Sequence, residues 1–220
     1  CESLTDSDAI PTPMEHKPDQ LITLILDKTC FYGESGGQVG DTGWIEGPNG
    51  KFEVFNTQRE GDFFLHCGVL REGSIDLGQE VNAHVDECRR QAIRRAHTAT
   101  HLVHAALQHF LGSHAVQQGS KVDADLLRFD FSHASPVGNE TLQDIEAMVN
   151  EGTSEAVLVS ANLLPLEEAR HAGAMMLFGE KYPDVVRMVS IDGISKELCG
   201  GTHVDNTGEI GLVKIIHEES

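Results

Sequence analysis

Several features common in other protein classes are missing from the 220-residue sequence. No run approaches the ~20 consecutive apolar residues that a membrane-spanning helix requires, and no signal-peptide pattern opens the chain. Five cysteines form no C-x-x-C pair, and their odd number argues against a disulfide framework. We therefore expect a cytoplasmic protein without a membrane partner. The first residue is Cys1 and not Met, so we also expect a piece of a longer polypeptide.

Motifs that bind nucleotide phosphates, or that make a zinc peptidase, are also missing. The sequence contains neither G-K-[ST] nor G-x-G-x-x-G, which excludes a Walker phosphate loop and the usual dinucleotide-binding turn. In the segment "HTATH", Thr98 stands where the H-E-x-x-H signature needs its glutamate. A peptidase of the H-E-x-x-H kind is therefore excluded.

Positive charge is scarce, because 16 Lys and Arg stand against 35 Asp and Glu, for a net charge of −19. Nucleic-acid binders usually carry a basic surplus, since neutralising phosphates supplies much of their affinity. The basic residues are unevenly spread, however, and four arginines fall within the stretch "RRQAIRR". These are Arg89, Arg90, Arg94 and Arg95. The stretch is either a solvated helix face, as most charge runs are, or a local basic patch on an acidic body.

Strand and helix patterns divide the chain into three parts. Residues 1–20 are rich in Pro, Ser, Thr and Asp, and predict a linker or fraying end. Residues 21–86 combine short strands with the glycine-rich "GESGGQVGDTG", and predict a small antiparallel, barrel-like β-subdomain. Residues 87–220 predict a two-layer α/β core that opens with a long helix and closes with a strand at 210–216. The expected fold class is α+β.

Three histidines occur close together in the long helix, within "HTATHLVH". His97 and His101 are four residues apart, so they face the same way at ~6 Å along the axis, as two metal ligands on one helix do. His104 lies on nearly the same face. One ion cannot bind both His97 and His104, which are ~10 Å apart along the axis. Spacing alone leaves open whether the pair is 97/101 or 101/104.

A second candidate segment, "CGGTH", places Cys199 and His203 around two glycines. We expect Gly200 and Gly201 to let the backbone turn tightly, so that both side chains reach one ion. With two helix histidines they give a Cys/His₃ set, which suits tetrahedral zinc. Two other interpretations stay open. In the first, Cys199 is a thiol nucleophile activated by His203. In the second, the zinc is purely structural and its coordination is completed by four protein ligands.

The order of these motifs resembles the editing domain of alanyl-tRNA synthetases and its free-standing relatives. The likeness includes "LDKTCFYGESGGQVGDTG", "RFDFSH", "LFGEKY" and "SKELCGGTHVDNTGEIG", and extends from about residue 21 to the end. It implies a zinc-dependent hydrolase that removes serine or glycine wrongly esterified to tRNA(Ala). It also implies a longer synthetase chain, whose synthetic domain is absent from these residues. The zinc ligands that it implies are His97, His101, Cys199 and His203.

Further roles follow from the resemblance and not from spacing. It implies a substrate pocket formed by a polar residue after the long helix and by the glycine-rich loop. The pocket residues are Gln117, Ser35, Gly36, Gly37 and Gln38. Cys199 and His203 are expected to act in catalysis through the ion, which orients the aminoacyl group or activates a water.

The arginines of the basic stretch and the third histidine of the long helix also have expected roles. The four arginines would guide the phosphates of the tRNA acceptor end. His104 is expected to pack beneath the site. The alternative function is a non-catalytic, zinc-stabilised module that binds tRNA and leaves its ester intact.

Overall fold

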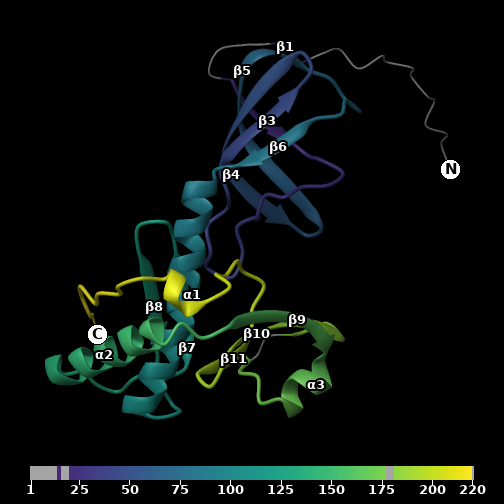
Figure 1. Ribbon diagram of the computed structural model, residues 1–220. Coiled ribbons are helices and arrows are strands. Elements are labelled where there is room, and N and C mark those ends of the chain that lie inside the picture. The colour runs from purple at the N-terminus through teal and green to yellow at the C-terminus, as the bar shows by residue number, and fades with distance from the viewer. Residues whose placement is uncertain (1–13, 16–19, 177–180, 220) are drawn as a thin grey trace. The chain divides into compact units, whose positions relative to one another are not determined.

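The computed structural model describes residues 14–15, 20–176 and 181–219 (Figure 1). Two compact units make up the chain. Unit 1 contains Cys1–Gly33 and Gly40–Asp86, and unit 2 contains Glu34–Val39 and Glu87–Ser220. Helices and antiparallel sheets occur together, which confirms the expected α+β class. The linker expected at residues 1–20 lies, apart from residues 14, 15 and 20, outside the described part of the chain.

Unit 1 is an antiparallel sheet built around a long hairpin of β4 and β5. Its strands are β1 (Met14–Glu15), β2 (Leu21–Leu24), β3 (Gly43–Gly47), β4 (Gly50–Glu60), β5 (Phe63–Ile75) and β6 (Asn82–Val85). The order is β1-β5-β4-β3-β6, and β2 also pairs with β5. Among the strands that the structure describes, no pairing joins β6 to β1 or β2. The sheet is open there, so a barrel is not confirmed.

A buried histidine links two segments of unit 1. His66 on β5 is fully buried, and its Nδ1 lies 3.0 Å from the carbonyl oxygen of Leu24 at the end of β2. Its Nε2 lies 2.8 Å from the hydroxyl of Thr29. Because a carbonyl oxygen only accepts, the neutral ring satisfies both contacts with its proton on Nδ1. Burial lowers the pKa of His66, and the bond to Leu24 opposes this only in part.

We expect His66 to make the chain less stable in mild acid. Its folded pKa is below the unfolded value of about 6.5, so the unfolded state takes up the proton first. Stability that is present above this pH is therefore lost as pH falls through the folded pKa. Urea unfolding between pH 7.5 and pH 5 should show a shallower loss for His66→Gln than for the parent chain. Equal slopes for the two proteins would contradict this account.

Unit 2 is organised around helix α1 (Glu87–Leu111). The other elements are β7 (Gln117–Val122), β8 (Leu127–Phe131), α2 (Asn139–Ser154), β9 (Val159–Pro165), α3 (Leu166–His171), β10 (Val185–Ile191), β11 (Ser195–Leu198) and a short 3₁₀ turn, η1 (Thr207–Glu209). Helix α2 and the β7–β8 hairpin pack against α1, whereas β9, β10 and β11 form a separate antiparallel sheet (Figure 1). No helix among the described residues combines the length and hydropathy needed to cross a membrane.

The core of unit 2 fixes α1 in place. Leu102 and Ala106, four residues apart on one helix face, pack with Ile145 of α2 and with Val189 of β10. A different side of α1 carries its three clustered histidines, which are also buried, at 5–6% exposed. The histidines therefore sit on a rigid, well-packed helix and not on a surface.

The strand expected at 210–216 is wrong, because residues 211–219 have no strand pairing. Side chains of α2 bind their backbone instead. The amide of Asn150 exchanges two hydrogen bonds of 2.8 Å with the backbone of Val213. Glu146 accepts from the backbone nitrogen of Ile215 at 2.7 Å. The apolar pattern that predicted a strand reflects contacts of Val213 and Ile215 with the core.

Candidate metal centre

Four side chains of unit 2 converge at one point. His97 and His101 come from α1, and Cys199 and His203 come from the segment after β11. One ligand atom of each lies within 4.8 Å of all the others. The sulfur of Cys199 is 3.4 Å from Nε2 of His97 and 3.3 Å from Nε2 of His203. Sulfur and nitrogen ligands of tetrahedral zinc are about 3.5 Å apart, so this cluster could hold one such ion.

An unpaired nitrogen points to a cation at the same place. Nε2 of His101 is buried, and no described residue gives it a hydrogen bond. Its other nitrogen, Nδ1, lies 3.0 Å from a carboxylate oxygen of Glu197. Buried polar atoms are rarely left unpaired, and a bound ion would satisfy this one. Three imidazoles and a thiol are also a donor set that zinc accepts.

The charges of the cluster favour a cation. Burial alone would raise the pKa of the Cys199 thiol, but the surrounding imidazoles of His101, His203 and His97 bring it well below its usual value. Burial alone would lower the pKa of His101, yet the charge of Glu197, its hydrogen bond to the ring and the nearby Cys199 sulfur together outweigh burial and raise it to about 10. Burial lowers the pKa of His203 to about 4, so that ring is neutral near pH 7. Thiolate and neutral imidazole are the forms that bind metal, so Cys199 and His203 already have these forms, whereas His101 must release its second ring proton when an ion binds.

The two glycines of the "CGGTH" segment act differently from the tight turn that the sequence predicted. Neither Gly200 nor Gly201 has a positive φ, so neither position requires the conformational freedom of glycine. A Cβ on Gly201 would overlap Cε1 and Nδ1 of His97, whereas a Cβ on Gly200 would meet nothing within 4 Å. A tight turn is therefore the wrong explanation for glycine at these two positions. Gly201 is needed because the ring of His97 packs directly on its backbone.

Two arginines hold the ligand-bearing segment by its carbonyl groups. Arg187 on β10 donates to the carbonyl oxygens of Cys199 and Gly201 at 2.7 and 2.8 Å. Arg94 on α1 donates to the carbonyl oxygen of His203 at 2.5 Å. Arg187 could not be selected from the sequence, since an arginine within a strand gives no signal of its own. The segment is thus fixed from a strand and from a helix.

The turn of the glycine-rich loop is a two-residue hairpin. Ser35 and Gln38 exchange both backbone hydrogen bonds, and Gly36 and Gly37 occupy the turn with φ values of 58° and 84°. Positive φ at both central positions is the I′ turn, for which glycine is suited. Ser35 and both glycines are exposed, whereas Gln38 is fully buried. Of these four, the described contacts bring only Gln38 to the cluster.

Gln38 holds a ligand and the ligand-bearing segment together. Its Oε1 lies 2.6 Å from Nδ1 of His97 and accepts from the backbone nitrogen of Thr202 at 2.9 Å. Its Nε2 donates to the hydroxyl of Thr202 at 3.0 Å. Gln117, the other expected pocket glutamine, begins β7 and donates to the hydroxyl of Ser120 at 3.1 Å. Gln38 therefore orients His97 so that Nε2 faces the cluster.

Thr98 performs the same task for His203. Its hydroxyl oxygen lies 3.2 Å from Nδ1 of His203 and accepts from the backbone nitrogen of Val204, also at 3.2 Å. It donates in turn to the carbonyl oxygen of Arg94 at 3.0 Å. The residue that excluded an H-E-x-x-H peptidase thus positions a candidate ligand.

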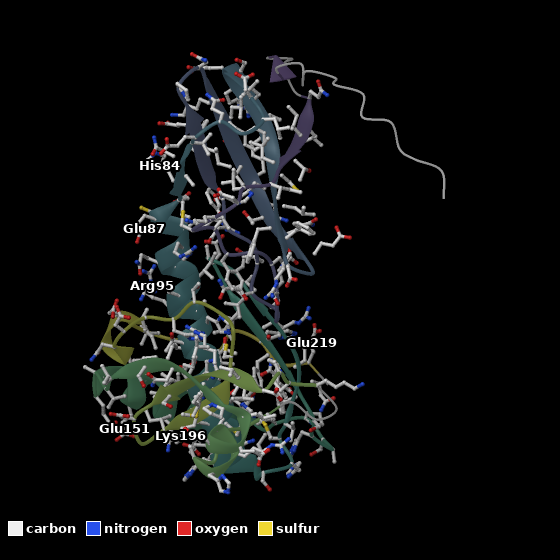
Figure 2. The ribbon with its side chains drawn as sticks, turned by 90° about the vertical axis from the view of Figure 1, so that its right-hand side faces the viewer. His84, Glu87, Arg95, Glu151, Lys196 and Glu219 are labelled. Atoms are coloured by element: carbon white, nitrogen blue, oxygen red, sulfur yellow. The ribbon has the colours of Figure 1, made fainter. Side chains whose placement is uncertain are left out.

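The four arginines of the basic stretch have different surroundings, and all are half-buried. Arg89 lies 3.4 Å from a carboxylate oxygen of Asp123, and Arg94 binds the ligand-bearing segment. Arg95, labelled on α1 in Figure 2, lines a cavity of about 740 Å³ between α1, β8, α2 and residues 210–219. The acidic partner of Arg89 offsets part of the charge that a tRNA phosphate would meet.

Two known families match separate parts of the chain. Residues 5–89 match the family described as tRNA synthetases class II (A). Residues 186–220 match the threonyl and alanyl tRNA synthetase second additional domain. This second match includes the segment with Cys199 and His203.

Similar proteins match almost the whole chain. The alanine–tRNA ligase of Rhodopirellula baltica is 47% identical over 219 residues, which cover 98% of this chain and 23% of the ligase. The ligase of Dichelobacter nodosus is 50% identical over 199 residues, covering 90% of the chain and 23% of the ligase. That of Methylobacillus flagellatus is 49% identical over 214 residues, covering 97% and 24%. The chain spans less than a quarter of the length of these relatives.

Proposed function

Because the chain belongs to the alanyl-tRNA synthetase family, in which it corresponds to the editing domain, we propose that it hydrolyses the ester of tRNA(Ala) wrongly charged with serine or glycine. The reaction takes place at a zinc ion held by His97, His101, Cys199 and His203. One observation carries this proposal. The four ligand atoms lie within 4.8 Å of one another and include a buried nitrogen of His101 that has no hydrogen-bond partner among the described residues.

The need for such a reaction follows from the size of alanine. A synthetic site large enough for alanine cannot exclude glycine, which is smaller. Serine adds only a hydroxyl, and a hydrophobic pocket rejects such a near-isostere weakly. A second site that hydrolyses the wrong ester supplies the discrimination that binding cannot.

The residues around the cluster prepare it for this task. Gln38 and Thr98 hold His97 and His203 in fixed orientations, and Arg187 holds the carbonyl groups on both sides of Gly200. The zinc ion, when bound, supplies a Lewis acid that polarises the ester carbonyl or orients the aminoacyl group.

The cluster is least buried on the side of Cys199. The three histidine ligands are buried and Cys199 is only half-buried. The space beside Gly200 is open. The aminoacyl end therefore enters beside Cys199 and Gly200, where Cys199 and His203 would hold the ion that supplies the Lewis acid.

The tRNA is held mainly by parts of a longer synthetase, because the net charge of −19 repels phosphates. The basic stretch at residues 89–95 guides the acceptor end locally, with weak and salt-dependent affinity. Gln117 and the turn at Ser35–Gln38 face the aminoacyl group in this proposal. The four described cysteines carry thiols and not disulfides, which is compatible with a reducing, cytoplasmic setting.

One observation favours the alternative of a non-catalytic, zinc-stabilised tRNA-binding module. Four protein ligands close a tetrahedral shell, as in structural zinc sites, whereas catalytic sites usually keep one open position. In the hydrolase, one ligand must therefore yield or the ion must position the substrate only. Activity distinguishes the two functions.

We expect the zinc-loaded chain to release serine from Ser-tRNA(Ala) and to leave Ala-tRNA(Ala) intact. Removing zinc with a chelator should lower the rate by more than about 100-fold, and added zinc should restore it. Alkylation of Cys199 should be slow while zinc is bound, because the ion occupies the sulfur. Hydrolysis that survives chelation but not alkylation would favour the thiol nucleophile. A fully loaded chain without activity, tested with excess tRNA at low salt, would favour the non-catalytic module.

A further inference from the structure

A buried carboxylate lies behind one of the candidate ligands. Glu197 on β11 is 8% exposed, and its Oε1 lies 3.0 Å from Nδ1 of His101. The same oxygen lies 3.3 Å from Nδ1 of His104. Ser195, on the same strand, donates its hydroxyl to this carboxylate at 2.8 Å. A buried anion with three hydrogen-bond partners is a built feature and not an accident of packing.

His104 uses both of its ring nitrogens away from the cluster. Its Nδ1 faces Glu197, and its Nε2 lies 3.2 Å from the amide nitrogen of Gln108. Its ring also lies against that of Phe129, with centroids 5.2 Å apart. Spacing left open whether His101 pairs with His97 or with His104. The geometry joins His101 and His104 through a carboxylate and not through an ion.

We propose that Glu197 is a positioning residue of the metal centre. It accepts the Nδ1 proton of His101 and thereby aims the Nε2 lone pair of that ring at the ion. His104 and Ser195 also bind this carboxylate and so hold it in place. The inference rests on the metal site of the proposed function but not on the hydrolytic reaction.

Charge distinguishes Glu197 from the other groups that orient ligands. His97 is hydrogen-bonded to the amide of Gln38 and His203 to the hydroxyl of Thr98, and both of these partners are neutral. Glu197 is an acid. A divalent ion beside one thiolate keeps a net positive charge in a buried place, and the nearby carboxylate balances it. A carboxylate behind an imidazole also fixes its tautomer and raises its basicity towards the ion.

The test measures zinc affinity by competition with a chromogenic chelator, starting from the zinc-free chain. Glu197→Gln keeps an acceptor but loses the charge, and should bind zinc about 10-fold more weakly. Glu197→Leu loses both and should bind about 100-fold more weakly. In NMR spectra of the zinc-loaded parent, the Nδ1 proton of His101 should appear as a downfield, slowly exchanging resonance. It should move upfield and exchange faster in Glu197→Leu.

A matched control is Glu146→Gln, which changes an acid of α2 that accepts from Lys214 and from the backbone of Ile215. This variant should lose stability and keep the parent zinc affinity. If Glu197→Leu fails to fold, judged by circular dichroism, Glu197→Gln carries the test. Parent-like affinity in folded Glu197→Gln, with an unchanged His101 proton, would overturn the proposal. A parent chain that binds zinc without hydrolysing Ser-tRNA(Ala) would remove the proposed function and leave this result standing.

Discussion

Gly201→Ala should lose zinc binding by more than about 100-fold, while Gly200→Ala should bind zinc like the parent chain. The added methyl group at position 201 would overlap the ring of His97, one of the four candidate ligands. Arg187 holds the carbonyl of the same residue at 2.8 Å, so the backbone cannot simply retreat. The ring must move instead, and its Nε2 leaves the cluster. Overpacking of this kind also costs about 1–3 kcal/mol of unfolding free energy.

Gly200→Ala is a control of the same chemistry one residue away. A Cβ there meets nothing within 4 Å, and its φ is not positive. Zinc affinity from chelator competition and unfolding free energy from urea titration should both separate the two variants. Equal behaviour of the two would show that the glycines serve the turn and not the packing of His97.

The sequence motifs predicted more of the metal site than helix spacing alone could. The helix histidines and the "CGGTH" segment predicted a Cys/His₃ set, and the resemblance to the editing domain implied the four residues that form the cluster, His97, His101, Cys199 and His203. The resemblance to the editing domain, which rested on the same motifs, is confirmed by the alanine–tRNA ligases. Spacing could not separate His101–His104 from His97–His101, because both pairs share a helix face. Only tertiary contacts with Glu197 and with Cys199 separate them.

In the fold, too, features set by neighbouring residues could be predicted, whereas features set by residues far apart in the sequence could not. Strands and helices follow from periodicity, which is a local property, and α1 ends at Leu111, just before a glycine with φ of 103°. The closure of the first sheet and the pairing of residues 210–216 depend on distant partners. Apolar β-branched residues predicted a strand there, but the backbone at Val213 binds Asn150 of α2. Local propensity cannot foresee a side chain that takes the place of a neighbouring strand.

Groups that orient the ligands were least accessible to sequence reasoning. Gln38 and His97 are 59 positions apart, and Arg187 and Glu197 lie in ordinary strand patterns. The resemblance implied a pocket at the glycine-rich loop, whereas the structure divides the loop between exposed turn residues and a buried glutamine. A motif marks where unusual residues gather, and only the fold shows which of them meet.

Gln38→Leu should destabilise the chain by about 2–6 kcal/mol and weaken zinc binding about 10- to 100-fold. Leucine fills a similar volume but offers no acceptor. The Nδ1 proton of His97 and the backbone N–H of Thr202 would then both lose their acceptor, the Oε1 atom of the fully buried Gln38. Each orphaned donor costs about 1–3 kcal/mol. Urea unfolding with and without zinc measures both effects, because zinc binding adds to stability only in the folded chain.

Gln117→Leu makes the same substitution at the other expected pocket glutamine and is the matched control for Gln38→Leu. Gln117 is half-buried and donates to the hydroxyl of Ser120, so its loss should cost about 1 kcal/mol or less and leave zinc affinity unchanged. If it faces the aminoacyl group, the variant should nevertheless hydrolyse Ser-tRNA(Ala) more slowly at full zinc occupancy. Gln38 would then act through the metal ligand and Gln117 through the substrate. A Gln38→Leu chain with parent-like stability and zinc affinity would show that His97 is oriented by its packing on Gly201 alone.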